Sequence, residues 1–438
     1  MFLAPRLAAV ALLGAAVAFA VGAATPASTG AALAVTDGLV IAGILLDVAL
    51  APSPRALNPI RIVPPVLSVG RNEQIDIVMR NPTGRPLRSM VRDAAPPSLG
   101  CTPVIHHVTL EPDAVMPLRS EVRPTRRGSI PLGPMTVRVH GPFGLAGRQT
   151  TLRDTTAVKV YPALPSRAEV MLRLDSARLL QVGERSASVR GGGTEFDSLR
   201  EYHPDDEFRR INWRATARTQ RPITNVYREE RNQQVMLLLD AGRSMAATVG
   251  GAPRFEHAID AAVAVAELAT RVGDHIGMLA FGADVVSMIG PKGSSAQPQR
   301  IIDALYAVEP RLEAAGYRRG FGALLARHRR RSLLVLLTEL AGEPALEPLI
   351  DAIPMLLSRH LLIVGAVLDP ELERLAMDPA PSSEQVYEKA AAAAALAARA
   401  RAAAHLRRMG AIVVDLPPGK LAGRLADEYL RIKAFGRL

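Results

Sequence analysis

A short apolar run followed by small and acidic residues is the first feature of this chain that could serve chemistry. Val235 to Leu239 form the run VMLLL, and Asp240, Gly242 and Ser244 come directly after it. A continuous apolar run of this length is typical of a strand buried in a parallel sheet. Because ligands of open α/β sheets bind at the carboxyl ends of the strands, these residues predict a binding site at that edge.

A dense group of charged residues precedes this run. It contains carboxylates, arginines and one histidine: Glu195, Arg200, Glu201, His203, Asp205, Asp206, Arg209, Arg210, Arg214 and Arg218. Acid–base catalysis or metal-assisted hydrolysis would need a histidine or carboxylate beside a nucleophile, or several converging ligands. The spacing matches no zinc protease, phosphate-binding loop or GxSxG nucleophile elbow. The stretch therefore favours binding over catalysis.

Two binding roles for this charged stretch remain open. In the first, its Arg and Glu side chains form an ion-paired connector that fixes two domains together, with Trp213 at the junction. In the second, it is an exposed docking face, and the excess of Arg over Lys favours planar recognition of carboxylates or phosphates. The residues that we assign to the binding surface are Arg200, Glu201, Asp206, Arg210 and Trp213.

The elements that must position these residues follow from periodicity. From Gln234 onward, strand patterns such as VMLLLD, HIGMLAF, SLLVLLTE, HLLIVGAVL and AIVVDL alternate with helical patterns, among them RFEHAIDAAVAVAELATRV and an Ala-rich run from Ser383 to Met409. Alternating strands and helices predict a doubly wound α/β domain over residues 234–438. In the Ala-rich run, Ala favours the helix and Arg keeps one face solvated.

The middle of the chain has a different pattern. Between residues 60 and 165, short alternating runs such as QIDIVM and MTVRVH are separated by Pro, Gly and Asn. Those are strand and turn signals, and they predict an all-β sandwich. His106 and His107 are adjacent, so on a strand they face opposite sides and do not share a metal. Residues 166–233 then form a connector that contains the charged stretch.

Two apolar segments occupy the first 55 residues, at about 7–24 and 31–51. Both are long enough to cross a bilayer, and they predict a transmembrane helical hairpin. The linker between them is uncharged, whereas Arg55, Arg61 and Arg71 follow the second segment, so the large C-terminal region is expected in the cytoplasm. The predicted location is the cell membrane, with more than one pass.

Three further readings bear on this hairpin. Asp47 lies near the inner end of the second segment, where Arg6 would also emerge, and we expect an interfacial ion pair between them. A cleaved secretory signal is the alternative for the first segment, and a spanning second segment would still leave the large region cytoplasmic. Basic residues near the hairpin also favour contact with anionic lipid headgroups.

The composition of the chain restricts the classes of partner that it is expected to bind. The formal charge of +11 and the pI near 10.3 favour anionic partners. Aromatic residues make up only 4% of the chain, which argues against single-stranded nucleic acid, whose binders supply stacking rings. Cys101 is the one cysteine, so no internal disulfide forms, in agreement with a reducing compartment without establishing one.

Several of these segments together resemble a known family. RGGGTEFDSLREY, RRINWRATAR, DAGRSM and the closing YLRIKAFGRL are similar to segments of the bacterial domain of unknown function 58 family. The resemblance implies an integral membrane protein with a β-sandwich and a von Willebrand factor A-like α/β domain. It also implies a MoxR-type AAA+ ATPase as partner, because such ATPases are often encoded beside family members. One departure is that Pro204, Asp205 and Asp206 stand where members carry Pro-Gly-Asp.

The resemblance further implies a divalent ion. A von Willebrand factor A-like domain holds it with an Asp-x-Ser-x-Ser loop, a later Thr and a later Asp. Here residues 240–244 read DAGRS, Glu339 stands in place of the later Asp, and the segment GYRRGF offers no third ligand. Asp240, Ser244 and Glu339 form the reduced candidate site for Mg²⁺. The alternative is a loop whose Asp and Ser cap a helix or bond to nearby backbone.

The sequence therefore predicts a membrane-anchored scaffold or adaptor that binds a protein partner, and it assigns no catalytic residue. The alternative is a metal-dependent hydrolase acting at the strand edge near Asp240, with turnover that depends on the ion.

Overall fold

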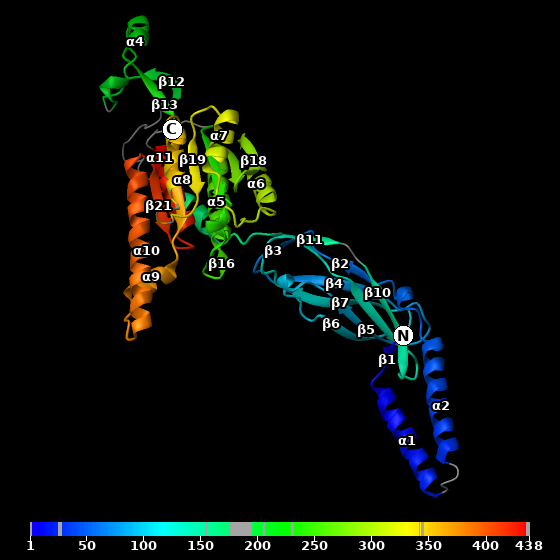
Figure 1. Ribbon diagram of the computed structural model, residues 1–438. Helices are drawn as coiled ribbons and strands as arrows, with labels where there is room; N and C mark the ends of the chain where they lie inside the picture. Colours follow the sequence, from blue (N-terminus) through cyan, green and yellow to red (C-terminus); the bar gives the residue numbers. More distant parts are fainter. Residues whose placement is uncertain are drawn as a thin grey trace. The chain divides into compact units, whose positions relative to one another are not determined.

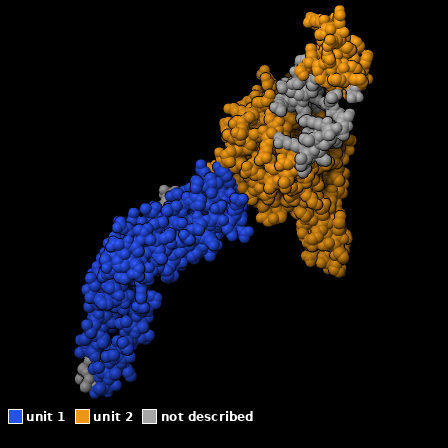
Figure 2. Space-filling model, turned by 180° about the vertical axis from the view of Figure 1, so that it is seen from behind, with its two compact units in different colours: residues 1–161 blue, residues 162–438 orange. Residues whose placement is uncertain are grey.

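The computed structural model describes residues 2–24, 29–153, 156–175, 195–204, 206–228, 232–340, 342 and 346–434. The chain divides into two compact units, residues 1–161 and residues 162–438 (Figures 1 and 2). Of the predicted connector, residues 176–194, 205 and 229–231 lie outside the described residues.

Two helices open the first unit. Helix α1 spans Arg6–Ala24 and α2 spans Thr29–Leu50, within a few residues of the predicted segments, and the two helices contact each other. The stretch Gly30–Leu57 has a mean hydropathy of 2.1, and its length and apolar character suit a membrane span. The apolar part of α1 is shorter. The described residues thus support one helix able to cross a membrane.

The C-terminal end of α2 is fixed by Asp47. Its fully buried carboxylate accepts hydrogen bonds from the backbone N–H groups of Phe143, Leu145 and Ala146, at 2.8, 2.7 and 2.8 Å. The expected ion pair with Arg6 is not formed among the described residues, because these N–H groups already satisfy the carboxylate. A Cβ at Gly141 would lie 2.1 Å from Asp47 Oδ1, so this close approach requires glycine.

Three small sheets follow, and their strand orders are β1-β10-β9-β5-β6, β2-β4-β7 and β3-β11-β8 (Figure 1). The strands are β1 Phe2–Leu3, β2 Ile60–Ile62, β3 Val66–Ser68, β4 Glu73–Arg80, β5 Leu87–Asp93, β6 Ile105–Leu110, β7 Val115–Val122, β8 Gly128–Pro131, β9 Met135–His140, β10 Ala146–Leu152 and β11 Ala157–Tyr161. Short 3₁₀ turns η2 and η3 span Pro54–Leu57 and Pro97–Leu99. Residues before α1 thus pair with β10, far along the chain.

The two-residue period of the strands builds the core of this β region. On β4, Ile75, Ile77 and Met79 are buried while the residues between them are more exposed. Ile77 and Met79 share a core with Val137 and Val139 of β9, so the sheets containing β4 and β9 face each other. The same period separates the adjacent histidines, since His106 reaches Ser120 Oγ at 2.8 Å while His107 is exposed.

The second unit begins with a helical segment at 166–175 that docks on its neighbours. Ser166 Oγ donates to Asp260 Oδ2 at 2.6 Å, and Arg167 Nε donates to Glu267 Oε2 at 2.7 Å. Burial raises the pKa of Asp260, and the hydrogen bonds from Ser166 oppose that rise. This segment of the predicted connector is therefore part of the α/β unit's own packing.

The charged stretch forms a small lobe, which we define as residues 195–228. Strand β12, Glu195–Glu201, pairs antiparallel with β13, Ile223–Arg228. Between them lie the 3₁₀ turn η4, Phe208–Arg210, and helix α4, Trp213–Thr219 (Figure 1). The Asn212 side chain begins α4 by accepting a hydrogen bond from Ala215 N at 3.0 Å.

The remainder is a six-stranded sheet with helices, in the order β18-β17-β14-β19-β20-β21 (Figure 1). Its main elements are β14 Gln234–Asp240, α5 Arg254–Val272, β17 His275–Phe281, β18 Val285–Lys292, α6 Gln297–Leu305, α7 Tyr317–Arg327, β19 Leu333–Leu337, α8 Glu347–Leu357, β20 Leu361–Val367, α9 Pro370–Met377, α10 Ser383–Arg408, β21 Ile412–Leu416 and α11 Leu421–Ala434. A 3₁₀ turn, η5 Arg243–Ala246, and a small hairpin of β15 Thr248–Val249 and β16 Ala252–Pro253 connect β14 to α5. All neighbouring pairs in the large sheet are parallel except β17 and β18.

The strand predictions for this sheet are confirmed for its parallel strands. Residues Val235 to Leu239 of β14 are fully buried, as the unbroken apolar run indicated. Strand β18 was not predicted, because its sequence VVSMIGPK lies on an edge and carries neither a clean alternation nor an apolar run. The capping box of Ser382 and Gln385 begins the Ala-rich helix α10.

Candidate functional site

The carboxyl edge of the large sheet holds Asp240 at the end of β14. Asp240 Oδ1 accepts a hydrogen bond from Gly242 N at 2.7 Å. Asp240 Oδ2 accepts from Tyr317 Oη at 2.7 Å and from Thr338 Oγ1 at 2.6 Å. Tyr317 begins α7 and Thr338 follows β19, so one buried carboxylate joins three elements.

Burial sets the protonation behaviour of this cluster. It raises the pKa of Asp240, while the hydrogen bonds from Thr338, Gly242 and Tyr317 oppose that rise. Burial and the nearby charge of Asp240 also raise the pKa of Tyr317 well above its usual value, so the phenol stays a hydrogen-bond donor at neutral pH. The cluster is a structural clasp, by which we mean that the Asp240 carboxylate links β14, α7 and the end of β19 through buried hydrogen bonds.

Ser244 does not join this clasp. It lies in the 3₁₀ turn Arg243–Ala246, is half-buried, and is not among the three groups that donate to Asp240. A Cβ at Gly242 would approach both Asp240 Oδ1 and Ala315 N at 3.0 Å. The loop therefore turns tightly around the Asp240 carboxylate with backbone in place of the expected hydroxyl.

Glu339 belongs to a second cluster at the same edge. Arg399 of α10 donates to Glu339 Oε1, and Arg254 Nε lies 3.2 Å from Glu339 Oε2. Arg399 also donates to Asp415 Oδ1 at 2.6 Å and to Val367 O at 3.3 Å. One guanidinium thus connects the carboxyl ends of β19, β20 and β21.

The environment of Arg399 strengthens this connection. Burial disfavours the charged guanidinium, but the hydrogen bond to Asp415 and the charge of Glu339 outweigh it and raise the pKa of Arg399. The side chains of Arg399 and Glu339 retain only 6% and 7% of their exposure. Low solvent access makes the cost of leaving either charge unpaired large.

These contacts decide how the candidate ligands fit a magnesium ion. A cation at Asp240 would have to displace Tyr317 and Thr338, and at Glu339 it would compete with two arginines. Within the described part of the chain, no three His, Cys, Asp or Glu residues gather as a metal site would require. Asp240, Ser244 and Glu339 therefore share an edge without forming an open oxygen cage.

The five predicted binding residues all lie in the lobe, where they form several separate contacts. Arg200 Nη2 lies 2.5 Å from Asp206 Oδ1, and Asp206 Oδ2 accepts from His203 N at 2.9 Å. Asp206 N also donates to His203 O at 2.9 Å, which closes a turn at this point, and Asp205 lies outside the described residues. Arg200 and Asp206 thus brace this turn.

Three further ion-pair and ring contacts complete the lobe. Glu201 Oε1 pairs with Arg221 at 3.0 Å and Arg210 Nε with Glu207 Oε2 at 3.2 Å; all but Arg210 are largely exposed. The rings of Trp213 and Phe208 meet edge to face, with centroids 5.5 Å apart. Their exposed fractions, 61% and 67%, are high for large aromatic side chains.

Sequence reasoning missed the partners of the two edge carboxylates. Tyr317 lies within the GYRRGF segment, where a Thr or Asp was sought and a phenol supplies the contact instead. Arg399 has a detectable signal. Ala392, Ala402 and Leu406 are buried on the same face of α10, at helical spacing from Arg399, whereas Arg401 is exposed.

The fold and the site define a protein with an apolar membrane-type helix, a β region and an α/β unit whose sheet edge is closed by internal contacts. Residues 198–407 match the family described as protein of unknown function DUF58. Uncharacterized proteins of Mycobacterium tuberculosis and Mycobacterium bovis are 27% identical over 192 residues, which is 43% of this chain. The alignment spans 59% of the length of those relatives.

Solved structures with local likeness are more distant. The conserved hypothetical protein BatB from Bacteroides thetaiotaomicron is 13% identical, with a TM-score of 0.31, and the match covers 46% of this chain and 98% of that one. The PapD-like domain 7 of human CEP192 is 12% identical, with a TM-score of 0.18, covering 26% and 91%.

Proposed function

We propose that this protein is a membrane-anchored scaffold or adaptor that binds a protein partner through the lobe, and that the partner is a MoxR-type AAA+ ATPase. In this proposal α1 and α2 form a membrane hairpin and the remainder faces the cytoplasm. The β region acts as a β-sandwich spacer and the α/β unit as a von Willebrand factor A-like domain.

The observation that carries the proposal is the exposed pair of Phe208 and Trp213. Aromatic side chains are enriched where proteins bind one another, and truncating them has large effects on affinity. The pair lies on a lobe whose turn is braced by Arg200 and Asp206. A braced turn loses little freedom on binding, which favours affinity.

The closed edge also favours binding over catalysis. Asp240 and Glu339, the carboxylates that a hydrolase would need at this edge, are engaged by Tyr317, Thr338 and two arginines. A general base must be able to reach the proton that it removes. The partner's identity rests on the resemblance to the family described above.

The test measures binding of the purified full-length protein, in lipid nanodiscs, to the MoxR-type ATPase of the same genome. Phe208→Ala with Trp213→Ala is expected to weaken binding at least about tenfold, as hot-spot aromatics do. Val386→Ala with Tyr387→Ala is the matched control, because these exposed α10 residues lie outside the lobe. We expect the control to bind like the wild type.

The outcomes separate two parts of the proposal. If the wild type fails to bind the ATPase with or without ATP and Mg²⁺, the assigned partner is wrong. If the Phe208 and Trp213 double variant binds like the wild type, the lobe surface is wrong while the partner stands.

A further inference from the structure

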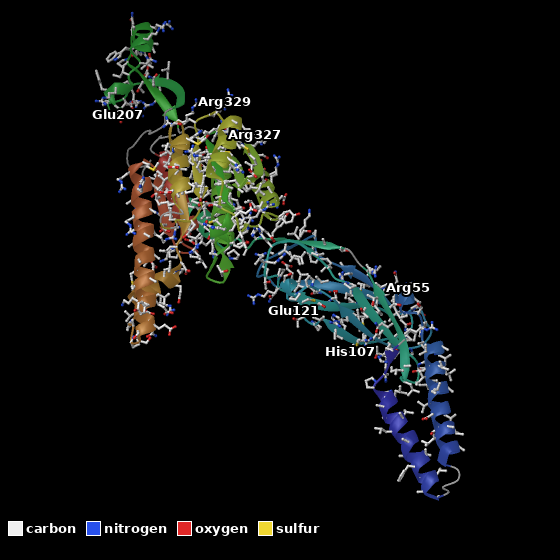
Figure 3. The ribbon with its side chains drawn as sticks, in the orientation of Figure 1. Arg55, His107, Glu121, Glu207, Arg327 and Arg329 are labelled. Atoms are coloured by element: carbon white, nitrogen blue, oxygen red, sulfur yellow. The ribbon has the colours of Figure 1, made fainter. Side chains whose placement is uncertain are left out.

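A cavity of about 650 Å³ lies in the first unit, on the outer face of the sheet that contains β5, β6 and β9. This volume falls in the range of small-ligand sites. It lies where the chain enters α1 and leaves α2, and the residues that line it include Arg6, Arg85, Arg88, His107 and His140. Figure 3 labels His107 near this end of the β region.

The cavity wall is basic, and none of its lining residues is acidic. Strand alternation places Arg88, His107 and His140 on the same outer face, because the residues beside Arg88 and His140 on their strands point into the core. Arg6 comes from the first turn of α1, whose N-terminus adds partial positive charge. Among the described residues, neither Arg6 nor Arg88 forms an ion pair with a carboxylate.

Asp47 approaches this wall at Gly141, but its carboxylate is already engaged in hydrogen bonds. Asp47 directs its carboxylate to the backbone N–H groups of the turn between β9 and β10, although its charge is felt by His140. Burial lowers the pKa of His140, and the charges of Arg88, His107 and Arg138 lower it further against the effect of Asp47. The lowered pKa favours the neutral imidazole of His140, so the fixed positive charges of the cavity wall are those of its arginines, Arg6, Arg85 and Arg88.

The cavity lies at the C-terminal end of α2. Arg85 Nη2 donates to Leu50 O, and Arg148 Nε donates to Val48 O at 3.0 Å, so both arginines cap the carbonyl end of α2. The 22 residues of α2 are about 33 Å long, close to the roughly 30 Å hydrocarbon core of a bilayer. If α2 spans the membrane, its carbonyl end and the cavity lie at the level of the headgroups.

We propose that this cavity binds a phosphate group, with Arg6 and Arg88 as its principal ligands, and that the group is carried by an anionic lipid headgroup. A phosphate suits the planar donors of arginine. The lipid source rests on the membrane-anchored part of the proposed function, and the phosphate chemistry does not.

The experiment counts phosphatidylglycerol retained by the purified full-length protein, using native mass spectrometry after release from nanodiscs that contain phosphatidylglycerol and phosphatidylcholine. The wild type is expected to retain phosphatidylglycerol in preference to phosphatidylcholine. Arg6→Gln with Arg88→Gln is expected to lower its affinity at least about tenfold, because two charge-assisted contacts are lost.

A matched double variant controls for total charge. Arg55→Gln with Arg92→Gln also removes two positive charges from the first unit, but neither of these residues lines the cavity. We expect it to retain lipid like the wild type. Arg6→Lys with Arg88→Lys keeps the charge and tests geometry, with an intermediate affinity expected. Thermal unfolding of each variant verifies its fold.

Competition with inorganic phosphate distinguishes a lipid headgroup from free phosphate as the ligand of this cavity. Displacement of phosphatidylglycerol by millimolar phosphate supports one shared site. If phosphate binds in detergent and depends on Arg6 and Arg88 but no lipid is retained, the lipid assignment is overturned. If the Gln double variant and its control retain lipid equally, the cavity is overturned as the site. None of these readouts involves the ATPase, so failure of the adaptor proposal is measured separately.

Discussion

Arg399 and Glu339 form a buried ion pair across 60 residues of sequence, between the middle of α10 and the loop after β19. The same guanidinium reaches Asp415 and Val367 O. An alanine-rich helix, whose small side chains offer little packing volume, is thereby attached to three strand ends.

Replacing Arg399 by Met should destabilise the α/β unit. The change leaves Asp415 without this partner and Glu339 with Arg254 alone, and we expect a loss of about 3 to 5 kcal/mol in the free energy of unfolding. Arg401→Met, on the exposed side of the same helix, should change it by less than about 0.5 kcal/mol. Urea unfolding followed by circular dichroism measures both. Equal effects of the two substitutions would contradict the role of Arg399.

Magnesium should have little effect on the wild type. Binding to the folded state alone would raise stability with ion concentration. Because the two edge carboxylates are engaged, we expect the unfolding temperature to be the same in EDTA and in about 10 mM Mg²⁺. A rise with Mg²⁺ that disappears in Asp240→Asn would restore the predicted metal site.

The stability contributed by Asp240 should depend on pH in the direction opposite to that of a salt-bridged carboxylate. Its folded pKa is raised above the unfolded value of about 3.9, so the folded state holds the proton more tightly. The contribution is full below the unfolded pKa and is lost as pH rises through the raised folded pKa. Asp240→Asn should flatten this part of the stability profile, measured by chemical denaturation between about pH 4 and pH 7.

Asp240→Ala serves as the contrasting variant. It leaves Gly242 N and the hydroxyls of Tyr317 and Thr338 without their acceptor in a buried site. We expect a loss of about 2 to 4 kcal/mol at all pH values in this range. If the Asn and Ala variants have the same stability, hydrogen bonding is not what this carboxylate provides.

Asp47→Ala should loosen the turn between β9 and β10. Three backbone N–H groups lose their buried acceptor, so the amides of Phe143, Leu145 and Ala146 should exchange hydrogen faster, by about tenfold or more. Asp37→Ala, an exposed position on the same helix, is the control and should leave that turn unchanged. Hydrogen exchange with mass spectrometry of the detergent-solubilised protein provides the measurement.

The fold was most predictable where burial imposes a period. The run VMLLL could be identified as a buried strand because it is short and unbroken. The segment from Arg254 to Val272 could be identified as a helix because its apolar residues follow a helical pattern over a helix-like length. The convergence of Asp240 and Glu339 on one edge followed from strand direction alone.

The partners of those residues were harder to predict. Asp47 looked as if it needed a cation, yet backbone N–H groups about 100 residues away satisfy it, and backbone donors leave no signature in residue types. Arg399 looked like a solvated residue of an Ala-rich helix, and only the packing of that helix places it inside. Tertiary contacts of this kind depend on geometry that a local pattern does not contain.

The pairing of Phe2 with Gly147 has a consequence for biosynthesis. The first strand must wait for its partner while about 145 residues emerge, roughly 7 to 30 s at ordinary translation rates. By that time both apolar helices, α1 and α2, have already been synthesised. The edge of this sheet is therefore completed only after α1, α2 and most of the β region have been made, so this strand pairing is a late event in assembling the β region.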